Sequence, residues 1–471
     1  TPITVHSPLQ PEIASGFTRK ADVVTQKFAV AAANPLATQA GFDVLKAGGS
    51  AIDAAIAVQM VLGLVEPQSS GLGGGAFLLH STADAKVQAF DGRETAPAAA
   101  TPDMLLNPQG QPLPFHEAVV GGLSVGTPGV LRVLAQAHAQ HGKLAWAKLF
   151  EPAIALAQKG FAISPRLYAQ LKADAYLRLD PNARAYFYQA SGEPYPVGYV
   201  LRNPELADVL QRIATHGVPA FYSGEVAEAM VRKVQQHPSN PGRLALSDLA
   251  NYQAKERTPV CFDHAALAQV YRVCGFPPPS SGAIAMGQIL GMLQHTPASL
   301  MSSPTDMADG APDPRWLHLY TEASRLAFAD RAQYVADPDF ASAPSGEWQS
   351  LLAPAYLRER AKLIRPTAMS QALPGVPVRG QRSSFAPMAE QPEYGTSHIS
   401  IVDGQGNALA MTTTIEDAFG SRQMVKGFLL NNELTDFSFS PRDAQGRLVA
   451  NRVQANKRPR SSMSPTLVFD K

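Results

Sequence analysis

The 471-residue chain contains only two cysteines, Cys261 and Cys274, which excludes a disulfide-rich scaffold and a cysteine-rich metal site. Charged residues make up only 17% of the chain and the formal net charge is +1. This balance excludes a nucleic-acid binder that depends on bulk charge, and also an acidic disordered tail. The longest apolar stretch, residues 51–65, is interrupted by Asp53 and Gln59. Because a membrane span needs about 20 apolar residues, we expect no span in this chain.

Motifs of several common enzyme classes are also missing. The 11 histidines are scattered without the HExxH spacing of a zinc site, and the chain has neither a GxSxG elbow nor a GxxxxGK[ST] loop. The triple glycine at residues 73–75 follows a predicted helix rather than a strand, so it does not fit a dinucleotide-binding fingerprint. We therefore expect no metal and no cofactor.

The two ends of the chain carry their own signals. The first residue is Thr1 rather than methionine, so we expect a mature or trimmed form from which an export signal has been removed. Residues 466–469 predict a strand that has no following partner. We therefore expect the protein to continue beyond Lys471.

Hydrophobic residues account for 45% of the chain, enough for a large core, and their spacing predicts helices in the N-terminal third. A helix over residues 35–46 ends at a glycine pair, and Ser50 caps a second helix that runs to about Leu64. Asp53 stands at its N3 position, as in a capping box. The glycine-rich loop 67–75 follows and leads into a strand over residues 76–80. Such a loop lets the backbone approach a ligand or another strand closely.

Further along the chain, helical spacing predicts helices over residues 127–141, 149–159 and 316–334, the last strongly amphipathic. Residues 259–276 predict a hairpin that places Cys261 and Cys274 on opposite arms, where they could form a disulfide. Residues 397–403 and 408–414 alternate apolar and polar side chains around a Gly-Gln-Gly-Asn turn, which predicts a second hairpin. Between the last helix and this hairpin, residues 366–395 have no periodicity, and we interpret them as a linker.

One position stands out on chemical grounds. The linker ends at Gly395, and the hydroxyl residue Thr396 stands where the second hairpin begins. Cleavage of the Gly395–Thr396 bond would give Thr396 a free amine, whose pKa is about 7.7–8.0 in the reference set. That amine could act as the base for the threonine's own hydroxyl. The alternative is an ordinary threonine at the start of a strand, and spacing alone does not decide between the two.

A set of motifs along nearly the whole chain resembles the γ-glutamyltranspeptidase family of N-terminal nucleophile hydrolases, and the motifs occur in that family's order. They are Asn-Pro-Leu-Ala at 34–37, Gly-Gly-Ser-Ala-Ile-Asp-Ala-Ala at 48–55, the glycine loop at 71–75, Gly-Arg-Glu-Thr-Ala-Pro at 92–97, Pro-Pro-Pro-Ser-Ser-Gly at 277–282, Phe-Ala-Asp-Arg at 328–331, Thr-Ser-His at 396–398, Leu-Asn-Asn-Glu at 430–433 with Asp-Phe-Ser at 436–438, and Arg-Pro-Arg-Ser-Ser-Met-Ser-Pro at 458–465.

The resemblance implies an α/β fold, the four-layer αββα sandwich of the N-terminal nucleophile hydrolases. It implies a precursor that cuts itself between Gly395 and Thr396 into a large subunit, 1–395, and a small subunit, 396–471, which together form one globular domain. Thr396 would attack the side-chain amide of a small γ-glutamyl compound such as glutathione. Water, or the amine of an amino acid or peptide, would then release the acyl group.

The resemblance also assigns the remaining site residues. Thr414 would orient the nucleophile, although the residues alone allow a hydroxyl that merely faces solvent. An Arg fork suits a carboxylate, and the family pattern assigns the substrate α-carboxylate to Arg93 together with Ser461 and Ser462. The α-ammonium would contact Glu433 and Asp436. Taken alone, these charged residues would be interpreted as solvated surface positions.

Two departures from the family pattern leave alternatives open. The position two after Thr414 is usually an asparagine that contacts the amino-acid head, whereas here it is Glu416, whose carboxylate would bind an ammonium but repel a carboxylate. The segment between Phe437 and Pro459 is short and has no tyrosine to cover the site. A glutaryl or cephalosporin-type acylase on the same fold therefore remains an alternative, as does an unprocessed, non-catalytic member.

Two further expectations follow from the resemblance. The glycine pair that would form the oxyanion hole is expected beyond Lys471. Family habit favours a periplasmic or secreted protein, and a disulfide between Cys261 and Cys274 would fit an oxidising compartment.

Overall fold

The computed structural model describes residues 21–266, 268–301, 313–377, 383–392 and 395–470. These form two compact units. Unit 1 comprises the chain through Arg257 together with Gln391–Phe439 and Val453–Asn456, and unit 2 comprises Thr258–Glu390, Ser440–Arg452 and Lys457–Lys471. Each unit contains residues from both sides of position 395, so neither corresponds to one predicted subunit. The predicted division into subunits stays a prediction.

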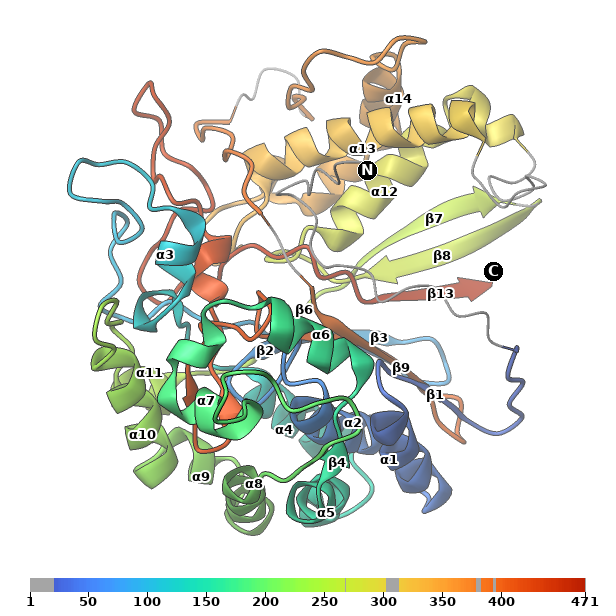
Figure 1. Cartoon of the computed structure of the whole chain (residues 1–471). Helices are drawn as coiled ribbons and strands as arrows, with labels where there is room; N and C mark the ends of the chain where they lie inside the picture. The colour runs from blue at the N-terminus through green and yellow to red at the C-terminus, as the bar shows by residue number, and fades with distance from the viewer. Residues whose placement is uncertain (1–20, 267, 302–312, 378–382, 393–394, 471) are drawn as a thin grey trace, which may run out of the picture. The chain divides into compact units, whose positions relative to one another are not determined.

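Unit 1 is built on a six-stranded antiparallel sheet in the order β1-β9-β10-β2-β3-β6 (Figure 1). The strands are β1 (Ala29–Ala31), β2 (Gly75–Ser81), β3 (Val87–Gly92), β6 (Lys255–Arg257), β9 (Ser397–Val402) and β10 (Ala408–Thr414). The predicted hairpin β9–β10 is confirmed, and Asp403 closes its turn by accepting hydrogen bonds from the backbone N–H groups of Gln405 and Asn407. Short pairs β4 (Phe161–Ala162) with β5 (Val200–Leu201) and β11 (Met424–Val425) with β12 (Phe428–Leu429) lie outside this sheet.

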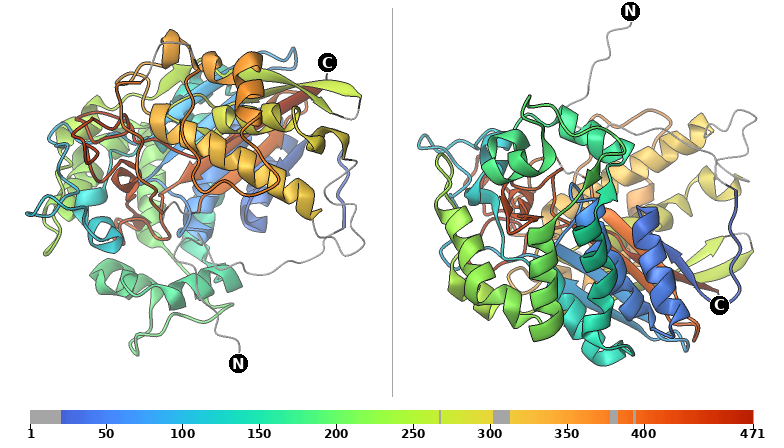
Figure 2. Two further views of the ribbon diagram at one scale, coloured as in Figure 1. Left: turned by 90° about the horizontal axis from the view of Figure 1, so that it is seen from above. Right: turned by 60° about the horizontal axis from the view of Figure 1, so that its bottom comes forward.

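The central helix of unit 1 is α2 (Ala51–Val65), and all its residues except Gly63 are buried. It packs against α1 (Pro35–Lys46) and against strands β9 and β10, and the right-hand view of Figure 2 shows the blue α1 and α2 lying across this sheet. The predicted capping box is confirmed: Ser50 Oγ accepts from Asp53 N, and Asp53 Oδ2 accepts from Ser50 N. The long apolar run is therefore a core helix. Within the described part of the chain, no helix combines the length and the apolarity needed to cross a membrane.

The other helices of unit 1 complete this hydrophobic core or cover its edges. They are α3 (Phe115–Val119), α4 (Val130–His141), α5 (Glu151–Lys159), α6 (Pro165–Ala173), α7 (Pro181–Phe187), α8 (Pro204–His216), α9 (Pro219–Tyr222), α10 (Gly224–Gln235) and α11 (Leu246–Asn251). The helices predicted over 127–141 and 149–159 correspond to α4 and α5, whose starts lie two or three residues later than predicted.

Unit 2 contains a three-stranded antiparallel sheet in the order β13-β8-β7 (Figure 1). Its strands are β7 (Val260–Ala266), β8 (Gln269–Gly275) and β13 (Thr466–Asp470), and its helices are α12 (Gly282–Leu293), α13 (Pro314–Tyr334) and α14 (Pro354–Ala361). Helix α12 packs on β7 and β8 and contacts both other helices. The predicted hairpin is confirmed, and a disulfide joins Cys261 to Cys274 at directly opposite positions. The predicted last strand pairs with β8.

The predicted linker, 366–395, contains no helix or strand among its described residues. It is not simply exposed, however. Ala386 is fully buried, forms a bridge with Val449, and donates its N–H to Leu448 O. Residues 378–382 and 393–394 of the predicted linker lie outside the described residues.

Candidate active site

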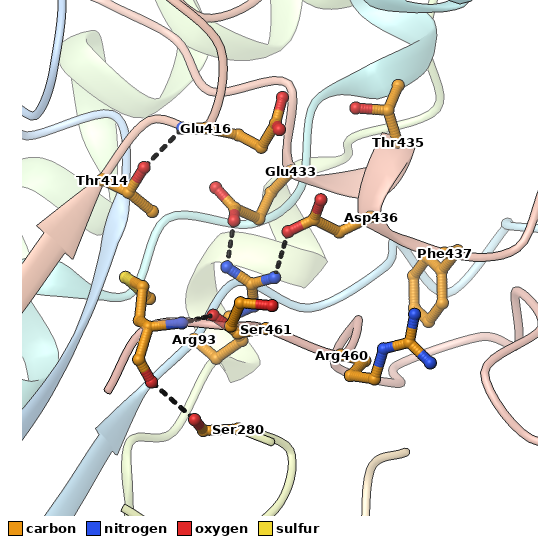
Figure 3. A network of polar contacts seen from close by, with 12 residues as sticks. Arg93, Ser280, Thr414, Glu416, Glu433, Thr435, Asp436, Phe437, Arg460 and Ser461 are labelled. Atoms are coloured by element: carbon orange, nitrogen blue, oxygen red, sulfur yellow. Dashed lines mark hydrogen bonds and ion pairs between the residues drawn. The ribbon is translucent and has the colours of Figure 1, made fainter. Parts of the chain in front are cut away.

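The β9–β10 hairpin carries both predicted catalytic threonines at one end. Thr396 is exposed and immediately precedes β9, and Thr414, which is 1% exposed, ends β10. The register pairs Thr412 with His398 and Thr413 with Ser397, so the next position opposite Thr414 is Thr396. Thr414 Oγ1 accepts a hydrogen bond of 2.8 Å from Glu416 N, which leaves its own O–H free to point elsewhere (Figure 3). The hairpin thus brings Thr396 and Thr414 to the same end of the paired strands β9 and β10.

The glycine-rich loop fixes this end of β10 by close backbone contact. A Cβ at Gly74 would overlap the carbonyl oxygen of Thr414, and a Cβ at Gly73 would overlap that of Leu429. The side-chain amide of Asn431 donates to Gly73 O at 2.7 Å. The glycines therefore serve approach to neighbouring strands and loops, which is one of the two uses that the sequence indicated.

Three residues predicted to hold an amino-acid head meet in unit 1. Arg93 directly follows β3, and Glu433 and Asp436 lie on the short 3-10 helix η7 (Glu433–Asp436). The Arg93 guanidinium pairs with Glu433 through Nη1 and with Asp436 Oδ2 through Nη2 at 2.6 Å (Figure 3). The Arg93 backbone is held as well, because its N–H donates to Asp91 and its carbonyl accepts from the Tyr252 hydroxyl.

These ion pairs are almost completely removed from water. The Arg93 side chain is 1% exposed and that of Glu433 is 0% exposed. Burial opposes the charge on Arg93, but the carboxylates of Glu433 and Asp436 outweigh it and raise the Arg93 pKa above its ordinary value. Burial raises the pKa of Glu433, although the guanidinium acts in the opposite direction. The cluster is therefore held together by charges that are largely shielded from solvent, with the Asp436 side chain 12% exposed.

Glu416 lies next to this cluster, at a backbone position with φ +77°. It is 4% exposed, and one of its carboxyl oxygens accepts a hydrogen bond from the Asn432 side chain. Burial raises the pKa of Glu416 well above its ordinary value, and the nearby acids Asp436, Asp417 and Glu433 raise it further. A neutral carboxylic acid offers one donor and one acceptor, much as a side-chain amide does. The sequence expectation of a repelling carboxylate at this position is thus weakened for the ligand-free protein.

Ser461 and Ser462 belong to unit 2, where both contact neighbouring elements. Ser461 donates its N–H to Pro279 O at 2.9 Å, and its hydroxyl oxygen accepts from Met463 N at 3.0 Å. Ser462 is exposed, and its hydroxyl oxygen accepts from Arg331 Nη2 at 2.6 Å. Their predicted contact with a substrate carboxylate stays a prediction.

Two positions of functional interest were not singled out from the sequence. Asn431 accepts from the N–H groups of Gly126 and Glu433 and donates to Gly73 O, so it fixes the start of η7 against the glycine loop. Glu94 is fully buried beside Arg93, and neither of its carboxyl oxygens accepts a hydrogen bond from the described residues. Both lie inside motifs quoted from the sequence, but their one-letter pattern does not reveal these contacts.

Known proteins resemble this chain over most of its length. The family model described as Gamma-glutamyltranspeptidase matches residues 37–471. The glutathione hydrolase proenzyme of Bacillus subtilis (strain 168) is 39% identical over 453 residues, which cover 93% of this chain and 72% of the relative.

Two solved structures extend the comparison to the fold. The γ-glutamyltranspeptidase of Helicobacter pylori has a TM-score of 0.69 and 31% identity, covering 77% of this chain and 100% of that one. A cephalosporin acylase from Bacillus halodurans has a TM-score of 0.75 and 27% identity, covering 98% of this chain and 78% of that one. The predicted fold class of the N-terminal nucleophile hydrolases is confirmed by these matches. Sequence and structure together make this chain an enzyme of the γ-glutamyltranspeptidase family.

Proposed function

We propose that the chain is a self-processing γ-glutamyl hydrolase and transferase that cleaves glutathione-like substrates through an ester on Thr396. The observation that carries this proposal is the buried cluster of Arg93, Glu433 and Asp436, which lies in the same unit as the Thr396–Thr414 end of the hairpin. The cluster can bind the charged groups of an amino-acid head, and the hairpin end can supply a nucleophile.

Processing would begin with attack of the Thr396 hydroxyl on the carbonyl carbon of Gly395. The peptide nitrogen becomes the free amine of Thr396, and water hydrolyses the resulting ester to leave Gly395 with a carboxylate. The amine, with an ordinary pKa of about 7.7–8.0, can then take the proton of the Thr396 hydroxyl. The exposure of Thr396, and the absence of helix or strand at the described residues 391, 392 and 395, support this step.

In turnover, the Thr396 oxygen attacks the γ-carbonyl of the substrate while the Thr396 amine accepts the hydroxyl proton. That proton passes to the leaving amine, and a γ-glutamyl ester remains on the enzyme. Water, or the amine of an amino acid or peptide, then attacks the ester and restores the hydroxyl. Thr414 contributes a hydroxyl opposite Thr396 that can orient the nucleophile.

The charges of the cluster favour a γ-glutamyl head over a glutaryl one. In the ligand-free protein Arg93 is neutralised by Glu433 and Asp436. A zwitterionic head brings one carboxylate for Arg93 and one ammonium for the two acids, so no buried charge loses its partner. A glutaryl group has no ammonium and would leave both acids unpaired, which is costly in a buried site.

A cephalosporin-type acylase is the second candidate, because the acylase from Bacillus halodurans covers nearly the whole chain. Rates on γ-glutamyl and glutaryl anilides separate the two functions. We expect faster turnover of the γ-glutamyl anilide, and a reversed preference would favour the acylase.

Processing is tested on a denaturing gel together with N-terminal sequencing. We expect two bands, the smaller beginning Thr-Ser-His. Thr396→Ala should give a single uncleaved band with no turnover, whereas the matched Thr396→Ser should retain both in part. Wild-type protein that stays intact after prolonged incubation would instead indicate an unprocessed, non-catalytic member. Residual turnover by Thr396→Ala would refute the nucleophile assignment.

We also propose that the protein works in the periplasm or outside the cell. The disulfide between Cys261 and Cys274 supports this, since disulfides persist in oxidising compartments. Cell fractionation followed by thiol labelling without reductant provides the test. We expect the protein in the exported fraction with both thiols protected, and free thiols on cytoplasmic protein would contradict the proposal.

A further inference from the structure

Glu94 is a buried acid that the proposed reaction does not use. It follows Arg93 in the chain and is 0% exposed. Glycines line its site: a Cβ at Gly75 would overlap Glu94 Oε2, and a Cβ at Gly126 would lie 2.9 Å from Glu94 Cβ. The backbone at these two glycines therefore leaves room for this side chain and confines it in one place.

The carboxyl group of Glu94 lies close enough to that of Glu433 for the charge of Glu433 to act on it, and both side chains are 0% exposed. Neither oxygen of Glu94 accepts a hydrogen bond from an N–H or O–H of the described residues, and the same holds for Glu433 Oε2. Two carboxylates have no donor between them, whereas one proton shared by the pair satisfies both groups. Buried polar atoms are nearly always hydrogen-bonded, so we infer that the two carboxyl groups share one proton.

The proton belongs on Glu94 because the guanidinium favours the ionised form of Glu433. Arg93 Nη1 donates to Glu433 Oε1, on the side of that carboxylate away from the orphaned oxygen. Burial, and then the charge of Glu433, raise the pKa of Glu94 well above its ordinary value, while Arg93 acts in the opposite direction. The titratable and charged groups around Glu94 are Arg93, Glu433, Tyr222 on α9, Tyr252 with its hydroxyl on Arg93 O, and Arg132 over the Tyr222 ring.

We propose that Glu94 is a positioning residue of the proposed amino-acid site, whose carboxylic acid donates a hydrogen bond to Glu433 Oε2 and so fixes the Glu433 carboxylate for a substrate ammonium. The effect on substrate rests on the proposed function, whereas the hydrogen bond itself does not. Loss of the proton at high pH would place two like charges side by side and turn Glu433 away. The KM for a γ-glutamyl substrate would then rise without a change in kcat, since neither side chain forms a hydrogen bond with Thr396 in the described part of the chain.

Two substitutions separate the donor from the bulk of the side chain. Glu94→Gln keeps an N–H donor but cannot ionise, and Glu94→Leu removes the donor. For Glu94→Gln we expect a KM within about twofold of wild type at neutral pH and no rise at high pH. For Glu94→Leu we expect a KM about tenfold higher at every pH, as the loss of one hydrogen bond to a charged group implies, with kcat within about twofold. Glu256→Gln, on an exposed position of β6, controls for the substitution itself.

Two measurements without substrate test the proton directly. The infrared difference between wild type and Glu94→Gln at neutral pH should contain the carbonyl band of a buried carboxylic acid. The folded wild type keeps this proton above about pH 4.3, where free glutamate loses it, so its stability falls with rising pH relative to the glutamine variant. We therefore expect the Tm of Glu94→Gln, minus the Tm of wild type, to increase between about pH 5 and about pH 8.

If the infrared band is absent and the Tm difference between Glu94→Gln and wild type does not change with pH, the proposed hydrogen bond is refuted, even if γ-glutamyl turnover is normal. A KM for Glu94→Gln as high as that of Glu94→Leu would overturn the positioning role. Presence of the band in a wild type that turns over no γ-glutamyl substrate would confirm the hydrogen bond but refute the proposed function. The glutamine variant and the spectrum keep the test decisive if Glu94→Leu fails to fold.

Discussion

Replacement of Arg93 by methionine tests how much the buried ion-pair cluster contributes to stability and to substrate binding. Methionine preserves much of the side-chain length but removes the charge and the fork. The guanidinium, at 1% exposure, then no longer neutralises Glu433 and Asp436, which are 0% and 12% exposed. Removing one partner of a buried ion pair costs about 3–5 kcal/mol. For a unit of this size, we expect a decrease in Tm of roughly 5–12 °C at about pH 8.

The loss should depend on pH in a definite direction. Without Arg93, burial dominates and the pKa of Glu433 rises further. Above about pH 4.3 the folded variant then retains a proton that the unfolded chain releases, so its stability falls as pH rises toward the raised pKa. Each unit of pKa shift corresponds to about 1.4 kcal/mol, so the Tm deficit should be clearly smaller at about pH 5 than at about pH 8.

Thermal unfolding at the two pH values, with kinetics on a γ-glutamyl anilide, measures both effects. We expect kcat/KM to fall by at least about 100-fold, because the substrate carboxylate loses two charge-assisted hydrogen bonds. Lys233→Met is the matched control: Lys233 forms an ion pair with the buried carboxylate of Asp180 in the same unit. It should lower Tm and leave KM unchanged.

Adding Glu433→Gln and Asp436→Asn to Arg93→Met should restore much of the Tm, because no buried charge then lacks a partner. It should not restore turnover. Equal losses in Tm at both pH values, or no recovery in the triple variant, would refute the reasoning that uncompensated carboxylates cause the loss.

Three other substitutions test neighbouring conclusions. Glu416→Gln should gain in Tm over wild type as pH rises and keep kcat/KM within about threefold, because the buried acid is held neutral; an unchanged pH profile would contradict that state. Gly74→Ala forces the carbonyl of Thr414 away, so we expect the free energy of unfolding to fall by about 1–3 kcal/mol and kcat/KM to fall about tenfold or more. The control Gly404→Ala, whose added Cβ would meet open space, should behave as wild type in both assays. Asp330→Asn removes a buried carboxylate that pairs with the Arg360 guanidinium in unit 2, so denaturant unfolding should show a decrease of about 3–5 kcal/mol in the free energy of unfolding. A decrease no larger than that caused by replacing an exposed acid would argue that the pair does not stabilise the fold.

Local sequence signals were sufficient for the helices and hairpins that depend on neighbouring residues. Helix α1 has the predicted bounds, Ser50 and Asp53 form the predicted capping box, and both hairpins occur where alternation and turn residues indicated them. These signals depend on contacts within a few residues, where the periodicities of helix and strand act directly.

The order of the sheet could not be predicted in this way. Strand β10 pairs with β2, more than 300 positions earlier in the chain, and β9 separates β10 from β1. The pair of Arg93 with Glu433 spans 340 positions, and composition and spacing carry no signal for it. Only the family resemblance predicted that Arg93 and Glu433 belong to one site. The amphipathic pattern of α13 likewise did not reveal that Asp330 is buried, because its partner Arg360 comes from α14.

The electrostatics of the Arg93 cluster also limit the pH at which the enzyme can act. The Arg93 guanidinium pairs with Glu433 and Asp436 and is also acted on by the charge of Glu94, whereas the buried Glu416 is acted on by the charges of Asp436 and Glu433. Four ionised acids would leave the buried cluster with an excess negative charge, and the protons on Glu94 and Glu416 remove most of it. The Thr396 amine must be neutral to act as a base, which requires a pH near or above about 7.7–8.0. We therefore expect kcat to rise through that range, and KM to rise at still higher pH as Glu94 and Glu416 lose their protons. A KM that stays flat to the alkaline limit of stability would show that neither acid controls binding.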